Sequence, residues 1–144
     1  MKLSTRGRYA LRAMIDLTQN QHNNLKPISL RDISKRQEIS LQYLEQLFNK
    51  LKKANLVKST RGAGGGYLLA EEAEKINAGD IIRAVEGPIV LIDCILIGKK
   101  TKKNIPKRCN RVGDCAIRVL LEGITQQINQ TLDTTSLKDL CKIA

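Results

Sequence analysis

The stretch PISLRDISKRQEISLQYLEQLFNKLKKANLVKSTRGAGGGYLLA, residues 27–70, decides the fold, and it opens with two helix-start signals in tandem. Ser29, followed by Asp32, is typical of the capping box that begins a helix. Ser40 is a second candidate N-cap, with apolar residues on either side placed as a hydrophobic staple. The spacing therefore predicts two short helices joined by a turn.

The second predicted helix has one apolar face and one polar face. Its apolar residues recur at helical spacing and are Leu41, Leu44, Leu47, Phe48 and Leu51. The opposite face carries amides, a carboxylate and cations, namely Gln42, Glu45, Gln46, Asn49, Lys50 and Lys53. Two capped helices in tandem, the second turning amides and cations outward, are typical of a helix-turn-helix that reads DNA.

A glycine-rich hairpin is predicted after this helix pair. Two β-prone runs, residues 56–57 and 67–69, flank the sequence STRGAGGG. Glycines permit the positive φ of tight turns and leave room for a close approach. We predict a DNA-binding wing with Gly64 and Gly65 at its tip, from which Arg61 reaches a minor groove or a phosphate. The alternative is an ordinary loop, and GAGGG is not a phosphate-binding loop because no Lys-Ser/Thr pair follows it.

The composition favours a nucleic-acid partner. The 144 residues carry a formal net charge of +11, with a pI near 9.8, which suits a polyanion. The chain has no Trp, one Phe and three Tyr, too few for a protein that stacks single-stranded bases. Because no apolar run approaches a membrane span and the N-terminus lacks a signal-peptide core, we expect a cytoplasmic protein with no membrane partner. The single histidine, His22 in a predicted loop, and the lack of a CxxC pair disfavour an enzyme.

Two more helices are predicted to complete the DNA-binding domain, residues 1–88. Residues 5–21 should form an amphipathic helix, with four cations clustered at its start: Lys2, Arg6, Arg8 and Arg12. This basic start is either a solvated face or a phosphate contact. Residues 73–85 should hold a helix, or two short ones broken near Asn77, and Gly87-Pro88 should end it.

The rest of the chain divides into a cationic loop and a long helix. Residues 98–111 contain seven Lys or Arg and no acidic residue, which predicts a mobile loop within the cysteine-containing segment 89–113. From residue 114 to 132 a predicted helix carries an apolar seam: Ile117, Leu120, Leu121, Ile124, Ile128 and Leu132. The seam is too long for so small a domain to cover, so we predict that residues 114–144 hold a dimerisation helix and a short last helix capped at Ser136. The alternative is a helix packed on its own domain.

Three of the four cysteines bracket the cationic loop with the spacing C-x14-C-x5-C: Cys94, Cys109 and Cys115. In a reducing compartment such cysteines are ligands or buried thiols more often than disulfides. Nearby Lys and Arg charges favour the thiolate, which is the ligand form. Three thiolates suit an iron–sulfur cluster, or zinc with a fourth ligand, although the spacing alone also allows a loop without metal. Cys141 stands apart, and we expect it to be a structural thiol.

Three stretches, MKLSTRGRYALRAM, DISKRQEISLQYLEQLF and STRGAGGGYLLA, resemble the IscR-type regulators, winged-helix repressors of bacterial iron–sulfur cluster assembly genes. The wider family includes nitric-oxide-sensing and cysteine-metabolism repressors. The resemblance covers nearly the whole chain and is close across residues 1–90. It implies a homodimer that reads palindromic double-stranded DNA, a winged helix-turn-helix, a long dimerisation helix and a three-cysteine loop.

The resemblance also implies roles for individual residues. Cys94, Cys109 and Cys115 would be the thiolate ligands of a [2Fe–2S] cluster whose occupancy changes which DNA sites are bound. The residues that match the recognition-helix surface are Gln42, Tyr43, Glu45 and Gln46. The negative charge of Glu45 would tune site choice, and Arg61 matches the wing arginine.

Two departures from the IscR pattern concern the cluster. The first two cysteines lie farther apart than in IscR, so the loop carries an insertion near residues 98–107. The fourth ligand of IscR, a histidine, is matched here by Arg118, and the carboxylate that related sensors take from a partner's first helix is matched by Arg8; arginine does not serve as a ligand. The remaining candidates are Asp93, Asp114, Cys141 and an external thiol. Two other functions stay open: a metal-free repressor of cysteine or sulfur metabolism, controlled by a partner protein or thiol oxidation, and a zinc-stabilised DNA-binding module.

Overall fold

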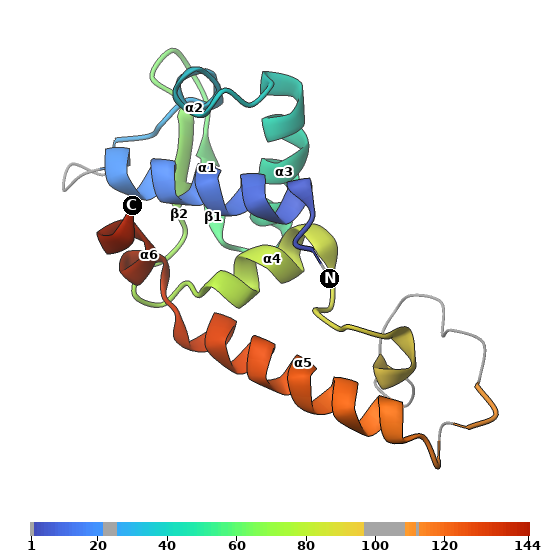
Figure 1. The fold of residues 1–144 in the computed structure, drawn as a ribbon. Helices are drawn as coiled ribbons and strands as arrows, with labels where there is room; N and C mark the ends of the chain where they lie inside the picture. Colours follow the sequence, from blue (N-terminus) through green and yellow to red (C-terminus); the bar gives the residue numbers. More distant parts are fainter. Residues whose placement is uncertain (1, 22–25, 97–108, 112) are drawn as a thin grey trace.

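The computed structural model describes residues 2–21, 26–96, 109–111 and 113–144 (Figure 1). The elements in chain order are α1 (Thr5–Gln21), α2 (Leu30–Gln37), α3 (Leu41–Lys53), β1 (Val57–Thr60), β2 (Gly66–Leu69), α4 (Ala78–Glu86), the 3-10 helix η1 (Asp93–Leu96), α5 (Ala116–Thr134) and α6 (Leu137–Ile143). The fold is mainly α with a small β-hairpin, and the predicted winged helix-turn-helix with a long C-terminal helix is confirmed.

Both predicted caps of the helix-turn-helix are formed. The Asp32 amide donates to Ser29 Oγ at 3.1 Å, and the Tyr43 amide donates to Ser40 Oγ at 3.2 Å. Between the two helices Glu38 adopts the left-handed conformation, with φ 53° and ψ 42°, which ends α2 and redirects the chain. The turn is therefore short, and α2 and α3 pack against each other.

One core joins α1 to α4, the hairpin and α6. Its fully buried side chains come from all of these elements, and the largest include Phe48, Met14, Leu17, Ile33, Leu44, Leu47, Leu51, Ile81, Val57 and Leu137. Each such side chain contributes about 1.5–3 kcal/mol by leaving water. In Figure 1, α1 lies across the hairpin and α3, and α6 packs on its far end. This packing fixes the polar face of α3 outward.

The hairpin pairs β1 and β2 antiparallel, with Val57 opposite Leu69. The wing is joined to the helix-turn-helix by a bridge, because Ile28 and Tyr67 exchange two backbone hydrogen bonds, of 3.0 and 2.8 Å. Gly66 permits this contact: a Cβ there would lie 2.3 Å from the Ile28 carbonyl oxygen. The glycine therefore allows the strand to pass against the chain that enters α2.

The segment after the hairpin was predicted to hold one helix over residues 73–85, or two short helices broken near Asn77, and the structure has neither arrangement. The structure has one helix there, and it begins only at Ala78. Asn77 is extended, with φ −103° and ψ 162°, and its side chain accepts a hydrogen bond from the Asp80 amide at 2.8 Å. An N-cap residue lies outside the helix, so residues 73–76 are excluded from it. Gly87, with φ 92°, ends α4 as predicted.

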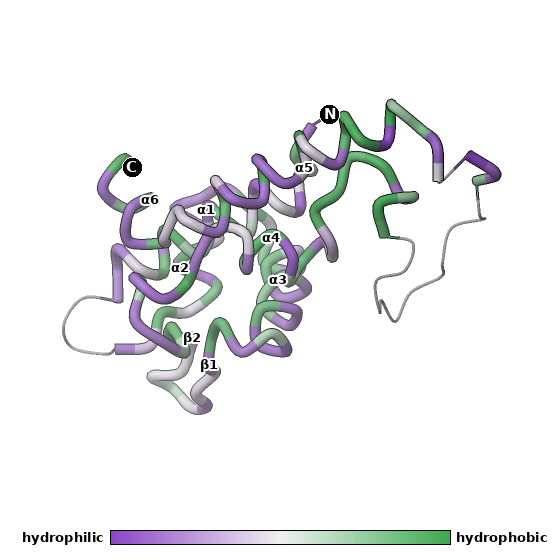
Figure 2. Tube along the Cα trace, turned by 90° about the horizontal axis from the view of Figure 1, so that it is seen from below, coloured by the Kyte–Doolittle hydropathy of each residue, from purple (hydrophilic) through white to green (hydrophobic). Residues whose placement is uncertain are grey.

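Helix α5 leaves the body of the domain (Figure 1). It packs on α4 and η1, and Thr125 is the one buried residue among its 19, all of which are described. Two of the six residues of the predicted seam are exposed within one chain, Ile117 at 64% and Leu120 at 62%, and the other four are half-buried. Figure 2 shows hydrophobic residues along this helix and along the 89–96 segment beside it. Among the described helices, none is long and apolar enough to cross a membrane.

Two predicted loops fall largely outside the described residues. His22 lies outside them, and so does the cationic loop up to residue 108, with the insertion expected near residues 98–107. Its described end, residues 109–111, is exposed. The last helix, α6, begins at Leu137, and its N-cap residue Ser136 forms a complete capping box with Asp139, as predicted.

Candidate nucleic-acid interface

The polar face of α3 is exposed along its length. Leu44, Leu47, Phe48 and Leu51 are buried on the other side, which fixes the orientation of the helix. The exposed residues include Gln42, Glu45, Gln46, Asn49, Lys50 and Lys53. Side-chain amides can donate to and accept from base edges in a major groove, which admits one α-helix. The face therefore has the groups and the shape of a recognition helix.

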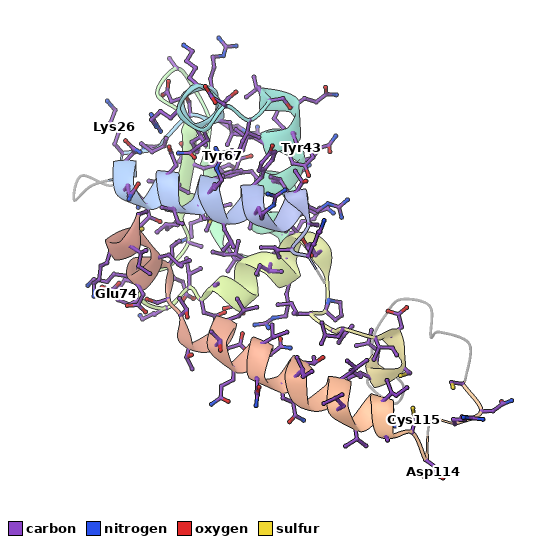
Figure 3. The ribbon with its side chains drawn as sticks, viewed as in Figure 1. Lys26, Tyr43, Tyr67, Glu74, Asp114 and Cys115 are labelled. Atoms are coloured by element: carbon purple, nitrogen blue, oxygen red, sulfur yellow. The ribbon has the colours of Figure 1, made fainter. Side chains whose placement is uncertain are left out.

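Tyr43, also predicted to lie at this surface, is half-buried and faces α1. Its ring packs edge-on against Tyr9, with the centroids 5.7 Å apart, and the Arg12 guanidinium carbon lies 5.4 Å from the centroid of the Tyr9 ring. Figure 3 shows Tyr43 at α3 beside α1. The ring joins α1 to the first turn of α3, and a DNA contact by Tyr43 stays a prediction.

The wing is tied to α3 by two contacts. The Tyr67 ring packs against Phe48 with the centroids 4.9 Å apart, and Lys52 Nζ donates to Ser59 Oγ at 2.6 Å. Burial, and then the negative charge of Glu45, raise the pKa of Tyr67. Tyr67 therefore lies within electrostatic reach of the α3 face, and the wing and the helix form one surface.

The two glycines predicted at the wing tip have different surroundings. A Cβ at Gly65 would lie 2.6 Å from the Thr60 carbonyl oxygen, and the Gly65 amide donates to Gly62 at 2.9 Å, so Gly65 is required by the turn. A Cβ at Gly64 would meet nothing within 4 Å. Gly64 and Arg61 are exposed, so they form the open part of the tip.

The four cations at the start of α1 divide into two groups. Arg12 binds the C-terminal end of α2, donating to the Gln37 carbonyl at 2.5 Å, and Arg6 Nη1 lies 3.4 Å from the Val85 carbonyl oxygen. Arg8, the predicted DNA contact, is exposed and bonds weakly to Thr5 Oγ1 at 3.4 Å within its own helix. Lys2 is exposed as well. Arg12 therefore bonds to α2 and Arg6, more weakly, to α4, whereas Arg8 and Lys2 are the outward cations.

An ion pair between the buried carboxylate of Asp16 and the partly exposed Arg36, which the sequence analysis missed, holds α2 on α1. Asp16 is 2% exposed, and its carboxylate accepts from Arg36 Nη2 at 2.7 Å, from Arg36 Nε at 3.0 Å and from Gln37 Nε2 at 2.8 Å. The hydrogen bond to Asp16 is the main cause that raises the pKa of Arg36. A signal was present, since Asp16 lies within the apolar stripe of its helix, where a carboxylate needs a partner.

The three cysteines of the predicted cluster site lie at the far end of the molecule from α6. Cys94 is half-buried in η1, Cys115 is the half-buried N-cap residue of α5, and Cys109 is exposed. Because η1 packs on α5, the segments of Cys94 and Cys115 lie together, as Figures 1 and 3 show. In the parts of the chain that the structure describes, no three His, Cys, Asp or Glu side chains converge on a metal position.

The candidate fourth ligands are separated by the fold. Asp93 and Asp114 are exposed at the same end as η1 and the start of α5. Cys141 lies on α6, with its Sγ 4.0 Å from the Ile15 carbonyl oxygen, and burial raises the pKa of its thiol. This separation sets Cys141 apart from the other three cysteines within one chain.

A winged helix-turn-helix with an exposed polar recognition helix defines the class of the protein, a DNA-binding transcription regulator. Residues 3–143 match Rrf2, described as an iron-dependent transcriptional regulator. The chain belongs to the Rrf2 family, and its resemblance to the IscR-type members is confirmed.

Individual relatives agree with this assignment. IscR of Vibrio atlanticus, an HTH-type transcriptional regulator, is 41% identical over 142 residues, which are 99% of this chain and 76% of that protein. The solved structure of CymR (YrzC), the global cysteine regulator of B. subtilis, superposes with a TM-score of 0.77 at 39% identity, covering 100% of this chain and 98% of CymR. T. potens IscR superposes with a TM-score of 0.73 at 39% identity, and the superposition covers 99% of this chain and 87% of T. potens IscR. These relatives are regulators and not enzymes.

Proposed function

We propose that this protein is a homodimeric, sequence-specific regulator that reads a palindromic operator, and that a [2Fe–2S] cluster switches its operator affinity at iron–sulfur cluster assembly genes. The observation that carries the DNA part is the exposed face of α3, whose amides at Gln42 and Gln46 stand on a helix fixed by its buried side. The domains would be residues 1–88 for DNA binding, 89–113 for the cysteine segment and 114–144 for dimerisation.

The sequence-independent part of the affinity for DNA would come from cations on α3 and the elements around it. The exposed basic residues of α1, α2, α3 and the wing include Arg8, Arg31, Lys35, Lys53, Lys58 and Arg61. Contacts between such residues and phosphates release counterions, so binding should fall steeply with added salt. The basic side chains position the protein on the duplex, and the amides of α3 discriminate among bases.

Replacing Gln46 with alanine should weaken operator binding by about 1–3 kcal/mol, about 5- to 150-fold, because one bidentate base contact is lost. Binding to scrambled DNA should not change, since the Gln46 side chain is exposed and carries no charge. Fluorescence anisotropy titrations at one salt concentration measure both affinities, with a duplex that the wild-type protein selects from a random library as the operator. Gln126→Ala, an exposed amide on α5, is the control. Equal losses on both duplexes would remove Gln46 from base readout.

Dimerisation would use the uncovered side of α5. Leu3 is 41% exposed at the start of the chain, and a groove of about 530 Å³ continues the seam; its lining includes Leu3, Ile82, Val90, Ile128 and Leu132. A two-fold axis through α5 would present two recognition helices, as a palindromic site requires. The groove and the seam together would be covered by the second copy.

The cluster would be held by the thiolates of Cys94, Cys109 and Cys115. Thiolates are the ligands that iron–sulfur clusters take, and Cys115 stands at the N-terminus of α5, which packs on η1, the segment of Cys94. When bound, the cluster would supply iron–thiolate bonds that oxygen, nitric oxide or iron scarcity can break. The chain itself would contribute the packing of η1 on the start of α5. A coupling of about 1–3 kcal/mol to operator affinity would suffice for a 5- to 150-fold switch.

Protein prepared without oxygen should show visible absorption with bound iron and sulfide. Each of Cys94→Ala, Cys109→Ala and Cys115→Ala should lose most of that absorption, because one iron–thiolate bond is removed in each. Cys141→Ala is the matched control and should keep the spectrum, since Cys141 lies on α6 beside α1. Absorption spectra and the iron-to-sulfide ratio measure the result, and unchanged spectra in all three variants would take these cysteines out of the site.

The second candidate function is a metal-free repressor of cysteine or sulfur metabolism, controlled by a partner protein or by thiol oxidation. Two points favour it: the superposition covers 98% of CymR, and the resemblance to IscR matches Arg118 to the fourth ligand, a role that arginine does not serve. Colourless protein with no iron and no sulfide after oxygen-free preparation would support it. Metal analysis that finds zinc would support the zinc-stabilised module instead.

A further inference from the structure

The last turn of α4 meets both helices of the proposed DNA interface. The Val85 carbonyl oxygen accepts from Arg6 Nη1 of α1 at 3.4 Å and from Lys50 Nζ of α3 at 3.2 Å. Carbonyls at the end of a helix lack partners in their own helix and attract cations. One peptide group therefore ties α1 and α3 to the same point.

The next residue, Glu86, caps the start of α1. The Gly7 amide donates to Glu86 Oε1 at 2.9 Å and to Ser4 Oγ at 3.2 Å, and the Ser4 hydroxyl also donates to Glu86 Oε1. A carboxylate at a helix N-terminus is favourable because the amides there are unpaired. A Cβ at Gly7 would lie 2.5 Å from Glu86 Oε1, so the glycine makes room for the carboxylate.

Glu86 also lies where the two DNA-facing helices begin. A hollow of about 500 Å³ is lined by Ser4, Thr5, Arg6, Tyr43 and Glu86, from the starts of α1 and α3 and the end of α4. Glu86 is exposed there, beside Arg6. A carboxylate near a DNA-binding face opposes the approach of a polyanion. The hydrogen bonds of Glu86 to the start of α1 would explain why a negative charge stands at this unfavourable place.

We propose that Glu86 is a positioning residue for operator recognition. Its bonds to Ser4 and Gly7 fix the start of α1, and the neighbouring Val85 carbonyl fixes α3 against it. This inference rests on the proposed DNA interface of α3. Without the carboxylate, α1 and α3 would no longer be held in one relative position. Their contacts to the phosphates and to the bases of one operator could then not all form at once.

The same turn leads directly to the segment that precedes Cys94. After Gly87-Pro88 the chain is held by α5: Asn129 Nδ2 donates to the Ile89 carbonyl at 2.9 Å, and the Leu91 amide donates to Thr125 Oγ1 at 3.3 Å. A shift of this segment would therefore reach α1 and α3 through a single helical turn. Glu86 lies in that turn and contacts α1 directly.

The test compares Glu86→Ala, which removes the acceptor, with Glu86→Gln, which keeps an oxygen for Ser4 and Gly7. The probes are a duplex that the wild-type protein selects from a random-sequence library and a scrambled version of it. Glu86→Ala should bind the selected duplex about ten-fold more weakly, the size of one hydrogen bond to a charged group. Glu86→Gln should recover most of that loss. The scrambled duplex should be bound equally or more tightly by both variants, because a negative charge is gone.

Glu72→Ala, an exposed acid after the wing, is the control and should leave both affinities unchanged. Denaturant unfolding shows that each variant is folded under the binding conditions, and hydrogen exchange should show a faster Gly7 amide in Glu86→Ala. The proposal is overturned if Glu86→Ala binds the selected duplex like wild type, or weakens on both duplexes equally. A wild-type protein that selects no duplex would instead overturn the proposed function.

Discussion

Replacing Asp16 with alanine should lower the free energy of unfolding by about 2–4 kcal/mol. The Asp16 carboxylate is 2% exposed and accepts hydrogen bonds from Arg36 and Gln37, which join α1 to the end of α2. Its loss leaves the Gln37 amide without this partner and Arg36 with no counter-charge there. Because the Arg36 side chain is 39% exposed, water recovers part of its hydration, which keeps the loss below that of a fully buried pair.

Urea or guanidinium unfolding of the two proteins measures this difference. The matched control is Glu74→Ala, which breaks an ion pair with Lys138 whose side chains are both about half exposed, and it should have no measurable effect. A double-mutant cycle of Asp16→Ala with Arg36→Ala should give a coupling energy above about 1 kcal/mol. If Asp16→Ala were no more destabilising than Glu74→Ala, the pair would not be what holds α2 in place.

Local signals in the sequence predicted the recognition helix, whereas the start of α4 and the packing of α2 on α1 depend on contacts between residues far apart in the chain. Ser29 and Ser40 cap their helices because an N-cap needs only the three residues that follow it. The apolar spacing that begins at residue 73 does not mark where α4 starts, because Asn77 pairs its backbone with Ser136. No short window of sequence contains that pairing, or the bond from Arg36 to Asp16.

The candidate site divides in the same way. The exposed amides of α3 could be predicted because a helix with one apolar face must turn the other outward. The inward turn of Tyr43 depends on Tyr9, which belongs to a different helix. The cysteine spacing predicted which segment carries the thiols, but fourteen residues between Cys94 and Cys109 permit many loop geometries, so it did not predict their arrangement.

Leu120→Asp should raise the dissociation constant of the proposed dimer by at least about 100-fold. Leu120 is 62% exposed in one chain and lies with Ile117 and Ile124 on one side of α5. If a second copy covers this side, the aspartate is buried without a partner, which costs at least about 2–3 kcal/mol. A two-fold interface contains the substitution twice, so the two costs add.

Operator binding should fall with dimerisation, because one recognition helix contacts only half of a palindrome. Sedimentation equilibrium across a concentration series gives the dissociation constant, and an anisotropy titration on the selected duplex gives the loss in affinity. The unfolding free energy of the single chain should change little, since Leu120 is not part of its core. A dimer that separates should therefore leave a folded monomer.

The decisive comparison is with the adjacent residue, Val119, which is 71% exposed and also apolar. Successive residues of a helix are turned by about 100°, so Val119 lies on a different side of α5 from Leu120. Val119→Asp also replaces an apolar side chain with aspartate, at nearly the same position along α5, and should leave the dimer intact. Equal weakening by the two substitutions would mean that the partner does not sit on the predicted seam, and no weakening by either would mean that α5 is not the interface.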